Sequence, residues 1–152
     1  MEERQNQEFS PIGVIHSPYE RRGQAPRQGR GREEICQVEV FGEFEEGLKD
    51  IEGFSHVILI YWFHKSKGYS LSVIPSWDAK PHGLFATRSP DRPNPLGLSV
   101  VELVAREGNI LRVKGLDAID GTPLLDIKPY VPQIDEQDNV RVGWLKDRLR
   151  RG

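Results

Sequence analysis

Residues 56–63 read HVILIYWF, and this uninterrupted apolar run decides the fold class. Its β-branched and aromatic side chains are those enriched in strands, and a continuous run of them is typical of a strand at the centre of a sheet. The apolar part, residues 57–63, is the longest in the chain and is far too short to span a bilayer. The run therefore predicts a central β-strand.

Further strands are predicted on both sides of this run. Cys36, Val38 and Val40 alternate with Gln37 and Glu39, which is the period of a half-buried strand. Short apolar segments separated by turn signals at residues 107–109 and 120–121 predict additional strands at residues 12–16, 84–87, 96–104, 110–116 and 124–128.

Helical spacing occurs only at residues 44–52, where Phe44, Leu48 and Ile51 would share one face and Gly47 weakens the pattern. Two long connections, residues 17–32 and 64–82, lack periodicity, and loops of that length are uncommon unless mobile or functional. We therefore expect a mainly β, single-domain, antiparallel barrel-like fold with at most one or two short helices. The domain would span residues 1–152 with its core at 9–132, leaving residues 1–8 and 145–152 peripheral.

The composition is that of an ordinary globular protein with a near-neutral charge. The chain has 152 residues, a net charge of -2 and one cysteine, Cys36, which excludes an internal disulfide and suits a reducing cytoplasm. The N-terminal MEERQNQEF lacks the apolar stretch of a secretory signal, so we expect a cytoplasmic protein. Basic residues cluster at 21–32 and 146–151, where they could be merely solvated or could contact nucleic acid phosphates.

Several common chemistries have no motif in this sequence. No G-x-G-x-x-G turn follows a strand, and the phosphate-binding G-x-x-x-x-G-K-[ST] loop is absent. The four histidines and single cysteine do not have zinc-ligand spacings, so no metal is expected. A G-x-S-x-G nucleophile turn is also missing, which makes the common hydrolases unlikely candidates.

A stiff polar loop precedes one of the predicted strands. Residues 86–100 read ATRSPDRPNPLGLSV, with Pro90, Pro93 and Pro95 within six residues. Each proline fixes its own φ, removes a backbone donor and restricts the residue before it. The loop is therefore rich in free carbonyls and polar side chains, and it resembles one half of a preorganised ligand pocket.

The literal strings of the chain resemble a known family. They are IGVIHSPY at 12–19, APRQ at 25–28, FHK at 63–65, FATRSPDRPNPLGLS at 85–99 and DGTPLLDIKPYVP at 120–132. Together these strings are similar to the TsaA-like family, the TrmO-type S-adenosylmethionine-dependent tRNA methyltransferases. The resemblance covers roughly residues 9–132, and its two longest strings are specific.

This resemblance implies a β-barrel that binds S-adenosylmethionine, usually as a homodimer without metal or membrane. The implied reaction is methylation of N6 of N6-threonylcarbamoyladenosine at position 37 of tRNA, in the anticodon loop. Carried over by motif, the cofactor contacts would be Pro26, Arg27, Gln28, His64, Lys65, Arg88, Leu98, Asp117, Ala118, Ile119 and Asp120. The candidates for substrate contact are Arg92, Asn94, Asp126, Lys128 and Tyr130.

The chemistry of these side chains suits that cofactor. Arg27 or Arg88 could pair with its carboxylate, and Asp117 or Asp120 could accept hydrogen bonds from its ribose or adenine. Leu98 would supply an apolar wall for the adenine.

The acceptor nitrogen must lose a proton, and Asp126, Tyr130 or Asn94 could orient it or take that proton. The sequence does not choose among the three.

Two other classes of function stay open at this stage. One is a methyltransferase with a non-RNA acceptor, and the other is a non-catalytic nucleotide- or RNA-binding barrel. Bases stacking on exposed aromatics would favour the binding module. We expect Tyr61, Trp62 and Phe63 to belong to the core instead, because they lie in the apolar run.

Overall fold

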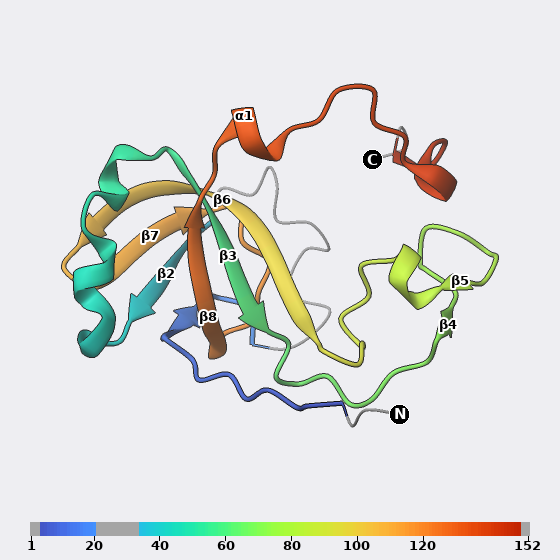
Figure 1. Cartoon of the computed structure of the whole chain (residues 1–152), viewed down its shortest axis with the longest axis horizontal. Helices are drawn as coiled ribbons and strands as arrows, with labels where there is room; N and C mark the ends of the chain where they lie inside the picture. The colour runs from blue at the N-terminus through green and yellow to red at the C-terminus, as the bar shows by residue number, and fades with distance from the viewer. Residues whose placement is uncertain (1–3, 21–33, 150–152) are drawn as a thin grey trace. The chain divides into compact units, whose positions relative to one another are not determined.

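Strand β3 (His56–Trp62) has a partner on each edge in the structure, a computed structural model that describes residues 4–20 and 34–149. It pairs antiparallel with β6 (Leu96–Glu107) on one side and with β8 (Thr122–Pro129) on the other (Figure 1). The predicted central strand is therefore confirmed, and it ends one residue earlier than expected.

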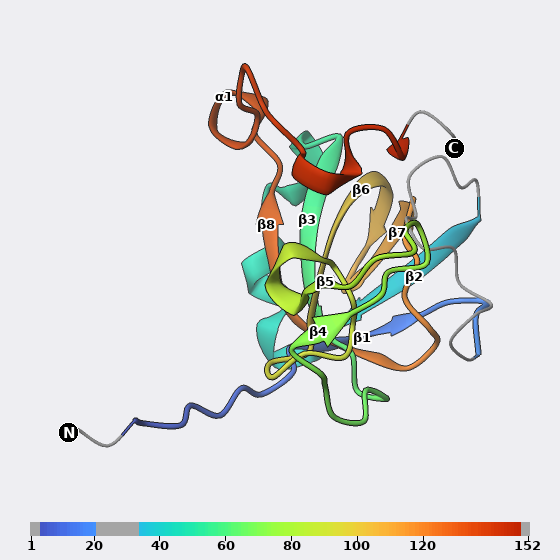
Figure 2. The same ribbon diagram turned by 90° about the vertical axis from the view of Figure 1, so that its right-hand side faces the viewer.

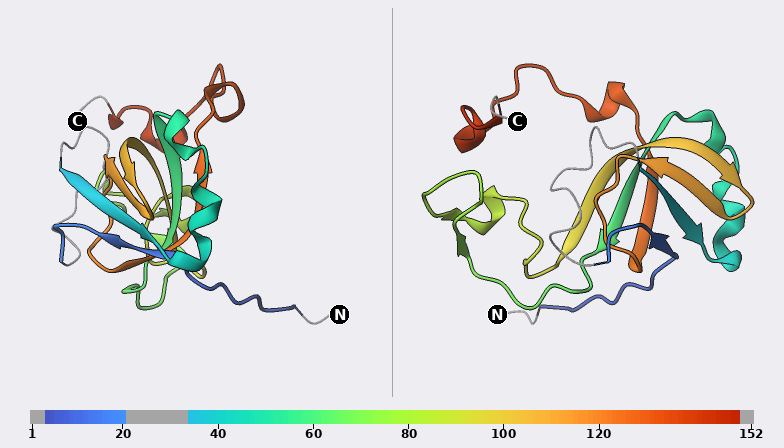
Figure 3. Two further views of the ribbon diagram at one scale, coloured as in Figure 1. Left: turned by 90° about the vertical axis from the view of Figure 1, so that its left-hand side faces the viewer. Right: turned by 180° about the vertical axis from the view of Figure 1, so that it is seen from behind.

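The strands close into an antiparallel barrel. Their order around the ring is β1-β2-β7-β6-β3-β8, and β8 pairs with β1 to complete it. The remaining members are β1 (Gly13–His16), β2 (Ile35–Val40) and β7 (Ile110–Lys114). Closure gives every strand of the ring a partner on both edges. The expected mainly β, barrel-like fold class is confirmed, and Figure 3 shows the barrel from two further sides.

Side chains of each strand alternate between the barrel interior and its outer face. On β3, Val57, Leu59 and Tyr61 are at most 2% exposed, whereas Trp62 is 43% exposed. The expectation that Trp62 belongs to the core is therefore wrong, because one step along a strand turns the side chain to the other face. Phe63 packs against the core, whose other members include Ile15, Val38, Val40, Val101, Leu111, Val113 and Leu124.

The helix expected at residues 44–52 is replaced by two 3-10 helices, η1 (Gly42–Leu48) and η2 (Ile51–Gly53). Asp50 adopts a left-handed backbone with φ of 72°, which interrupts a continuous helix. Leu48 is buried and Ile51 packs against the core, but Phe44 is 41% exposed. The expected apolar face is thus only partly used.

The strand expected at residues 84–87 is also wrong, since this segment forms a 3-10 turn, η3 (Leu84–Ala86). The Thr87 amide and hydroxyl both donate to the carbonyl of Leu84, at 3.0 and 2.7 Å. A threonine that bonds back to its own backbone in this way favours a turn over an extended strand.

The chain divides into two compact units. The barrel unit comprises Met1–His64 and Leu96–Tyr130, and the second unit comprises Lys65–Pro95 and Val131–Gly152. Within its described part, the second unit contains the two-stranded ladder of β4 (Ser72–Val73) and β5 (His82–Gly83), together with η3, α1 (Pro132–Asp135) and η4 (Gly143–Leu145); Figure 2 labels its strands. One domain over residues 1–152 stays a prediction. Over the described residues, no helix is long and apolar enough to cross a bilayer.

Gly97 allows the largest interior side chain to fit. It pairs with Tyr61 across the β3–β6 ladder, and Tyr61 is 2% exposed. A Cβ atom on Gly97 would lie 2.7 Å from Cζ of the Tyr61 ring and closer still to Cε2. The ring is enclosed by the barrel, so it has little freedom to move away.

Gly97→Ala should lower the free energy of unfolding by about 1–3 kcal/mol, the usual effect of overpacking a core. Urea titration would measure the change. Gly47→Ala is the matched control, because nothing lies within 4 Å of a Cβ at that position in η1. An equal stability of the two variants would show that Tyr61 can be displaced at no cost.

Candidate functional site

One end of the barrel gathers most of the expected cofactor residues. At this end β1, β3 and β7 finish and β2, β6 and β8 begin, because every neighbouring pair is antiparallel. His64 follows β3, Leu98 lies near the start of β6, and residues 117–120 follow β7. The structure therefore brings His64, Leu98, Asp117, Ala118, Ile119 and Asp120 to the same barrel mouth. The Leu98 side chain lies on the outer face of the barrel and is 59% exposed.

A hydrogen-bonded cluster of Tyr61, Ser99 and Asp117 lies at this mouth. The Tyr61 hydroxyl is 2.7 Å from Ser99 Oγ and donates to Asp117 Oδ1 at 3.1 Å. Ser99 Oγ donates to the same Asp117 oxygen at 3.4 Å. The cluster thus presents a carboxylate whose position is fixed from two adjacent strands.

Burial sets the protonation of this cluster. It raises the pKa of Asp117 above its ordinary value, although the hydrogen bonds from Tyr61 and Ser99 act in the opposite direction. Burial, and then the nearby charge of Asp117, also raise the pKa of Tyr61 far above its usual range. Tyr61 is consequently a neutral hydrogen-bond donor at physiological pH, and the carboxyl of Asp117 is the acceptor.

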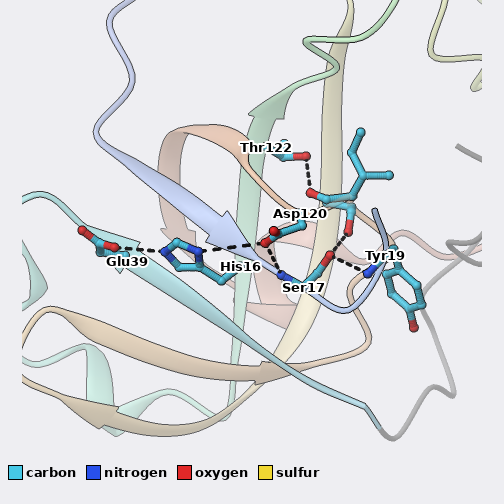
Figure 4. Close-up of polar contacts among 8 residues, drawn as sticks. His16, Ser17, Tyr19, Glu39, Asp120 and Thr122 are labelled. Carbon is cyan, nitrogen blue, oxygen red and sulfur yellow. Dashed lines mark hydrogen bonds and ion pairs between the residues drawn. The ribbon is translucent and has the colours of Figure 1, made fainter. Parts of the chain in front are cut away.

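Backbone and side-chain bonds fasten residues 118–122 to the turn after β1 (Figure 4). Ser17 N–H donates to Asp120 Oδ1 at 3.0 Å, and the Ser17 hydroxyl donates to the Ala118 carbonyl at 2.7 Å. The Thr122 hydroxyl donates to the Ile119 carbonyl at 2.6 Å. These bonds hold in place a loop that would otherwise have several conformations open to it.

A histidine lies beside this loop and borders an open groove. His16 Nε2 is 3.0 Å from Glu39 Oε1, and its Nδ1 is 4.0 Å from Asp120 Oδ1 (Figure 4). The groove has a volume of about 460 Å³ and is lined by His16, Ser17, Pro18, Glu34, Ile35 and Gln37. Sequence reasoning did not select His16, Ser17, Tyr61 or Ser99 for the site, although three of the four lie in strings that carry the family resemblance.

Lys65, Arg88, Arg92 and Asn94 belong to the second unit. Arg92 Nη1 donates to the carbonyls of Thr87 at 2.7 Å and Ser89 at 3.2 Å, so this guanidinium braces its own loop. The Ser66 hydroxyl also anchors the loop by donating to Asp91 at 2.8 Å. Arg88 lies between Thr87 and Ser89, whose carbonyls accept the hydrogen bonds from Arg92, and its own side chain is exposed.

The substrate candidates on β8 run away from the barrel mouth. Asp126 pairs with Ile60 and Lys128 with Ile58, and the Tyr130 amide donates to His56 at the start of β3. The five steps along the strand from Tyr61 back to His56 correspond to roughly 17 Å, which separates Tyr130 from the mouth. Asp126 and Lys128 form an ion pair of 3.1 Å in which both side chains are about half exposed.

The expected cofactor residues Pro26, Arg27 and Gln28 lie outside the described residues. Among residues 4–20 and 34–149, no group of three or more His, Cys, Asp or Glu side chains could hold a metal ion.

Comparison with known proteins relates the chain to tRNA methyltransferases. The family model described as the tRNA-methyltransferase O N-terminal domain matches residues 14–136. A probable S-adenosyl-L-methionine-binding protein of Pyrococcus abyssi is 56% identical over 94% of this chain and 78% of its own length. A tRNA (adenine(37)-N6)-methyltransferase of Mus musculus is 36% identical over 92% of this chain but only 34% of its own length.

A solved structure has the same fold. The crystal structure of TrmO from Pseudomonas aeruginosa matches with a TM-score of 0.77 and 36% identity, over 92% of this chain and 63% of that one. The chain thus spans less than two thirds of that TrmO and about a third of the mouse enzyme. From the family match over residues 14–136 and the shared barrel, the chain belongs to the TsaA-like, TrmO-type family.

Proposed function

We propose that this chain is an S-adenosylmethionine-dependent methyltransferase that methylates N6 of N6-threonylcarbamoyladenosine at position 37 of tRNA. The observation that carries the proposal is the fixed polar mouth of the barrel, which is built from the strings that the family model matches. Relatives named as S-adenosylmethionine-binding proteins and as tRNA (adenine(37)-N6)-methyltransferases support the cofactor and the class of acceptor.

The residues of the site fit the polar groups of this cofactor. Asp117 offers a positioned, partly buried carboxylate to ribose hydroxyls or to an amine, since a carboxylate has about four acceptor sites. Arg88 is exposed and can pair with a carboxylate through its planar guanidinium. When bound, the cofactor would supply a methyl group on a sulfonium for transfer to the acceptor nitrogen.

Positioning accounts for most of the acceleration expected from these residues. A neutral nitrogen attacking a sulfonium disperses charge, so fixed geometry matters more than a strong acid or base. Of the three candidates for orienting the acceptor nitrogen, Asn94 shares a loop with Arg88. Asp126 is instead ion-paired with Lys128, and Tyr130 follows the end of β8 beside the start of β3. We propose that Asn94 orients the acceptor nitrogen and that the proton which this nitrogen loses passes to solvent.

A second candidate function is methyl transfer to a different acceptor. It is favoured by the fraction of each relative that the chain covers, 34% of the mouse enzyme and 63% of the Pseudomonas TrmO, because acceptor recognition could depend on the remainder. The net charge of -2 is also low for a protein that binds RNA over a wide surface. We propose a cytoplasmic location for either function, given the single cysteine.

The purified chain should transfer tritium from labelled S-adenosylmethionine to tRNA that carries the threonylcarbamoyl group. Matched tRNA without that group should accept little or no label, because the group is part of the proposed substrate. Label appearing in a metabolite mixture but in neither tRNA would establish the second candidate function. Cofactor binding without transfer to any of these acceptors would leave the chain a binding module and contradict both.

Asp117→Asn should lower S-adenosylmethionine affinity at neutral pH by roughly tenfold, the effect of losing a charged hydrogen bond. Because the pKa of Asp117 is raised, the wild-type carboxyl takes up its proton at a higher pH than an exposed Asp. The affinity difference should therefore shrink as the pH is lowered. Calorimetry at several pH values would measure it, with exposed Asp138→Asn as the matched control.

The same substitution that lowers cofactor affinity should not lower the free energy of unfolding. A raised native pKa stabilises the fold only while the carboxyl is protonated, and this contribution is lost as the pH rises through the native pKa. Asp117→Asn should thus be at least as stable as wild type at neutral pH and lose that advantage below about pH 4. Unchanged cofactor affinity at all pH values would remove Asp117 from the site.

An exposed apolar face on the outside of the barrel supports the proposal of a homodimer. Trp62 pairs with Leu96 and Ile60 pairs with Leu98 on the outer face of β3 and β6. The exposed fractions are 43% for Trp62 and 59% for Leu98, and Val100 extends the face along β6 as far as the exposed Glu102. Contiguous apolar surface of this kind is typical of protein interfaces, and an isologous contact would cover it on both copies.

Light scattering at micromolar concentration should therefore report about twice the chain mass of 17.3 kDa. Val100→Glu should shift the mass toward the monomer, since it introduces a desolvated charge into the proposed contact. Ile35→Glu is the matched control, because Ile35 is a comparably exposed apolar residue on β2. A wild-type monomer that methylates tRNA at the full rate would contradict the dimer.

A further inference from the structure

The segment 143–149, called here the C-terminal strap, packs against the residues that lead into the Arg88 loop. The Trp144 indole stacks on the His82 ring, with ring centroids 4.4 Å apart and an angle of 19° between the planes. Its Nε1–H donates to the carbonyl of Ala86 at 2.8 Å. One side chain of the strap thus contacts both β5 and the end of η3.

Arg148 joins the strap to Asp78, whose carboxylate also contacts His82. Its Nη2 donates to Asp78 Oδ1 at 3.0 Å and its Nη1 to the Trp144 carbonyl at 2.8 Å. The other oxygen of Asp78 is 2.7 Å from His82 Nε2, and the Asp78 side chain is only 8% exposed. The hydrogen bond with His82, aided by Arg148, holds the pKa of Asp78 well below its usual range, so this carboxylate stays ionised.

The strap matters because the loop has little core of its own. Leu84 is the only buried residue among residues 65–95, and the β4–β5 ladder is two residues long on each strand. Few buried contacts mean a low free energy of local opening. The strap fixes the segment 82–86 on one side of Arg88, while Arg92 braces the carbonyls of Thr87 and Ser89 around it.

We propose that the C-terminal strap is a positioning element for Arg88, acting through His82 and Ala86. The strap lies beyond residue 136, where the match to the family model ends. The inference rests on the proposed function insofar as Arg88 contacts S-adenosylmethionine. Without the strap, Arg88 would have to be ordered at the moment of binding, and that entropy loss would weaken affinity.

A first experiment needs no cofactor. Arg88–Ser89 is the only bond between Lys67 and Arg106 that trypsin should cut, because Lys80 and Arg92 are both followed by proline. Trp144→Ala should raise the rate of cleavage at Arg88 by roughly tenfold, the effect of losing about 1.4 kcal/mol of local stability. Val140→Ala, at an exposed residue just before the strap that trypsin does not recognise, is the control and should leave the rate unchanged.

A second experiment measures cofactor affinity in a double-mutant cycle. Trp144→Ala should weaken S-adenosylmethionine binding by roughly threefold to tenfold, the entropy of one or two newly ordered side chains. The same change in an Arg88→Ala background should have less than about a twofold effect, since its influence passes through Arg88. Trp144→Phe keeps the ring stack and should recover much of the affinity.

The outcomes separate this inference from the proposed function. Equal cleavage rates for Trp144→Ala and Val140→Ala would overturn the positioning role of the strap, whatever the chain binds. Additive losses in the cycle, or no loss on Arg88→Ala, would overturn its action through Arg88. A wild-type chain that does not bind S-adenosylmethionine would overturn the proposed function, and the cleavage rates would still decide whether the strap orders the loop.

Discussion

Closure of the barrel through β1 is the constraint on which the rest of the structure depends. This strand has four residues and pairs with both β2 and β8. Gly13 makes the approach possible, because a Cβ there would overlap the carbonyl oxygen of Glu39. Once the ring is closed, the Gly121 amide donates to Ile15 and the turn after β1 reaches Asp120. The short strand therefore both completes the core and fixes the loop of the site.

Tyr61 links the core of the barrel to the chemistry at its mouth. Its ring fills the interior against Gly97, while its hydroxyl holds Asp117 and Ser99. Keeping a carboxylate partly buried costs stability, because the charged form loses hydration, and the hydroxyl donors offset only part of that loss. A barrel selected for stability alone would have no need of this arrangement. Its presence at the mouth supports the proposal that this end of the barrel binds the cofactor.

Sequence reasoning recovered the fold class because the barrel strands have clear patterns, as in residues 36–40 and 56–63. It failed where local hydrogen bonds or a backbone angle favour a turn, as at residues 84–86, where the Thr87 amide and hydroxyl both donate to the Leu84 carbonyl. The family resemblance proposed Asp117 and Asp120 as candidates, but periodicity could not show that Tyr61 and Ser99 both hydrogen-bond to Asp117. That contact depends on the register between β3 and β6 and on the path of the loop after β7. The packing of the strap could not be predicted either, because Trp144 and His82, whose rings stack, lie far apart in sequence.

The net charge of -2 is the sum of positively and negatively charged segments, and the positive segments are the ones that could attract RNA phosphates. Residues 65–95 contain five basic side chains and two acidic ones, and residues 21–32 contain five basic side chains and no acidic one, so the remainder of the chain is clearly acidic. One of the two acidic residues, Asp78, is already engaged by His82 and Arg148. The field that this segment presents is therefore more positive than its sequence alone suggests, and phosphate attraction falls off over about 8–10 Å at physiological salt. The segment that carries Arg88 would then attract tRNA phosphates together with the basic residues 21–32, and contacts that order residues 65–95 would order their basic side chains as well.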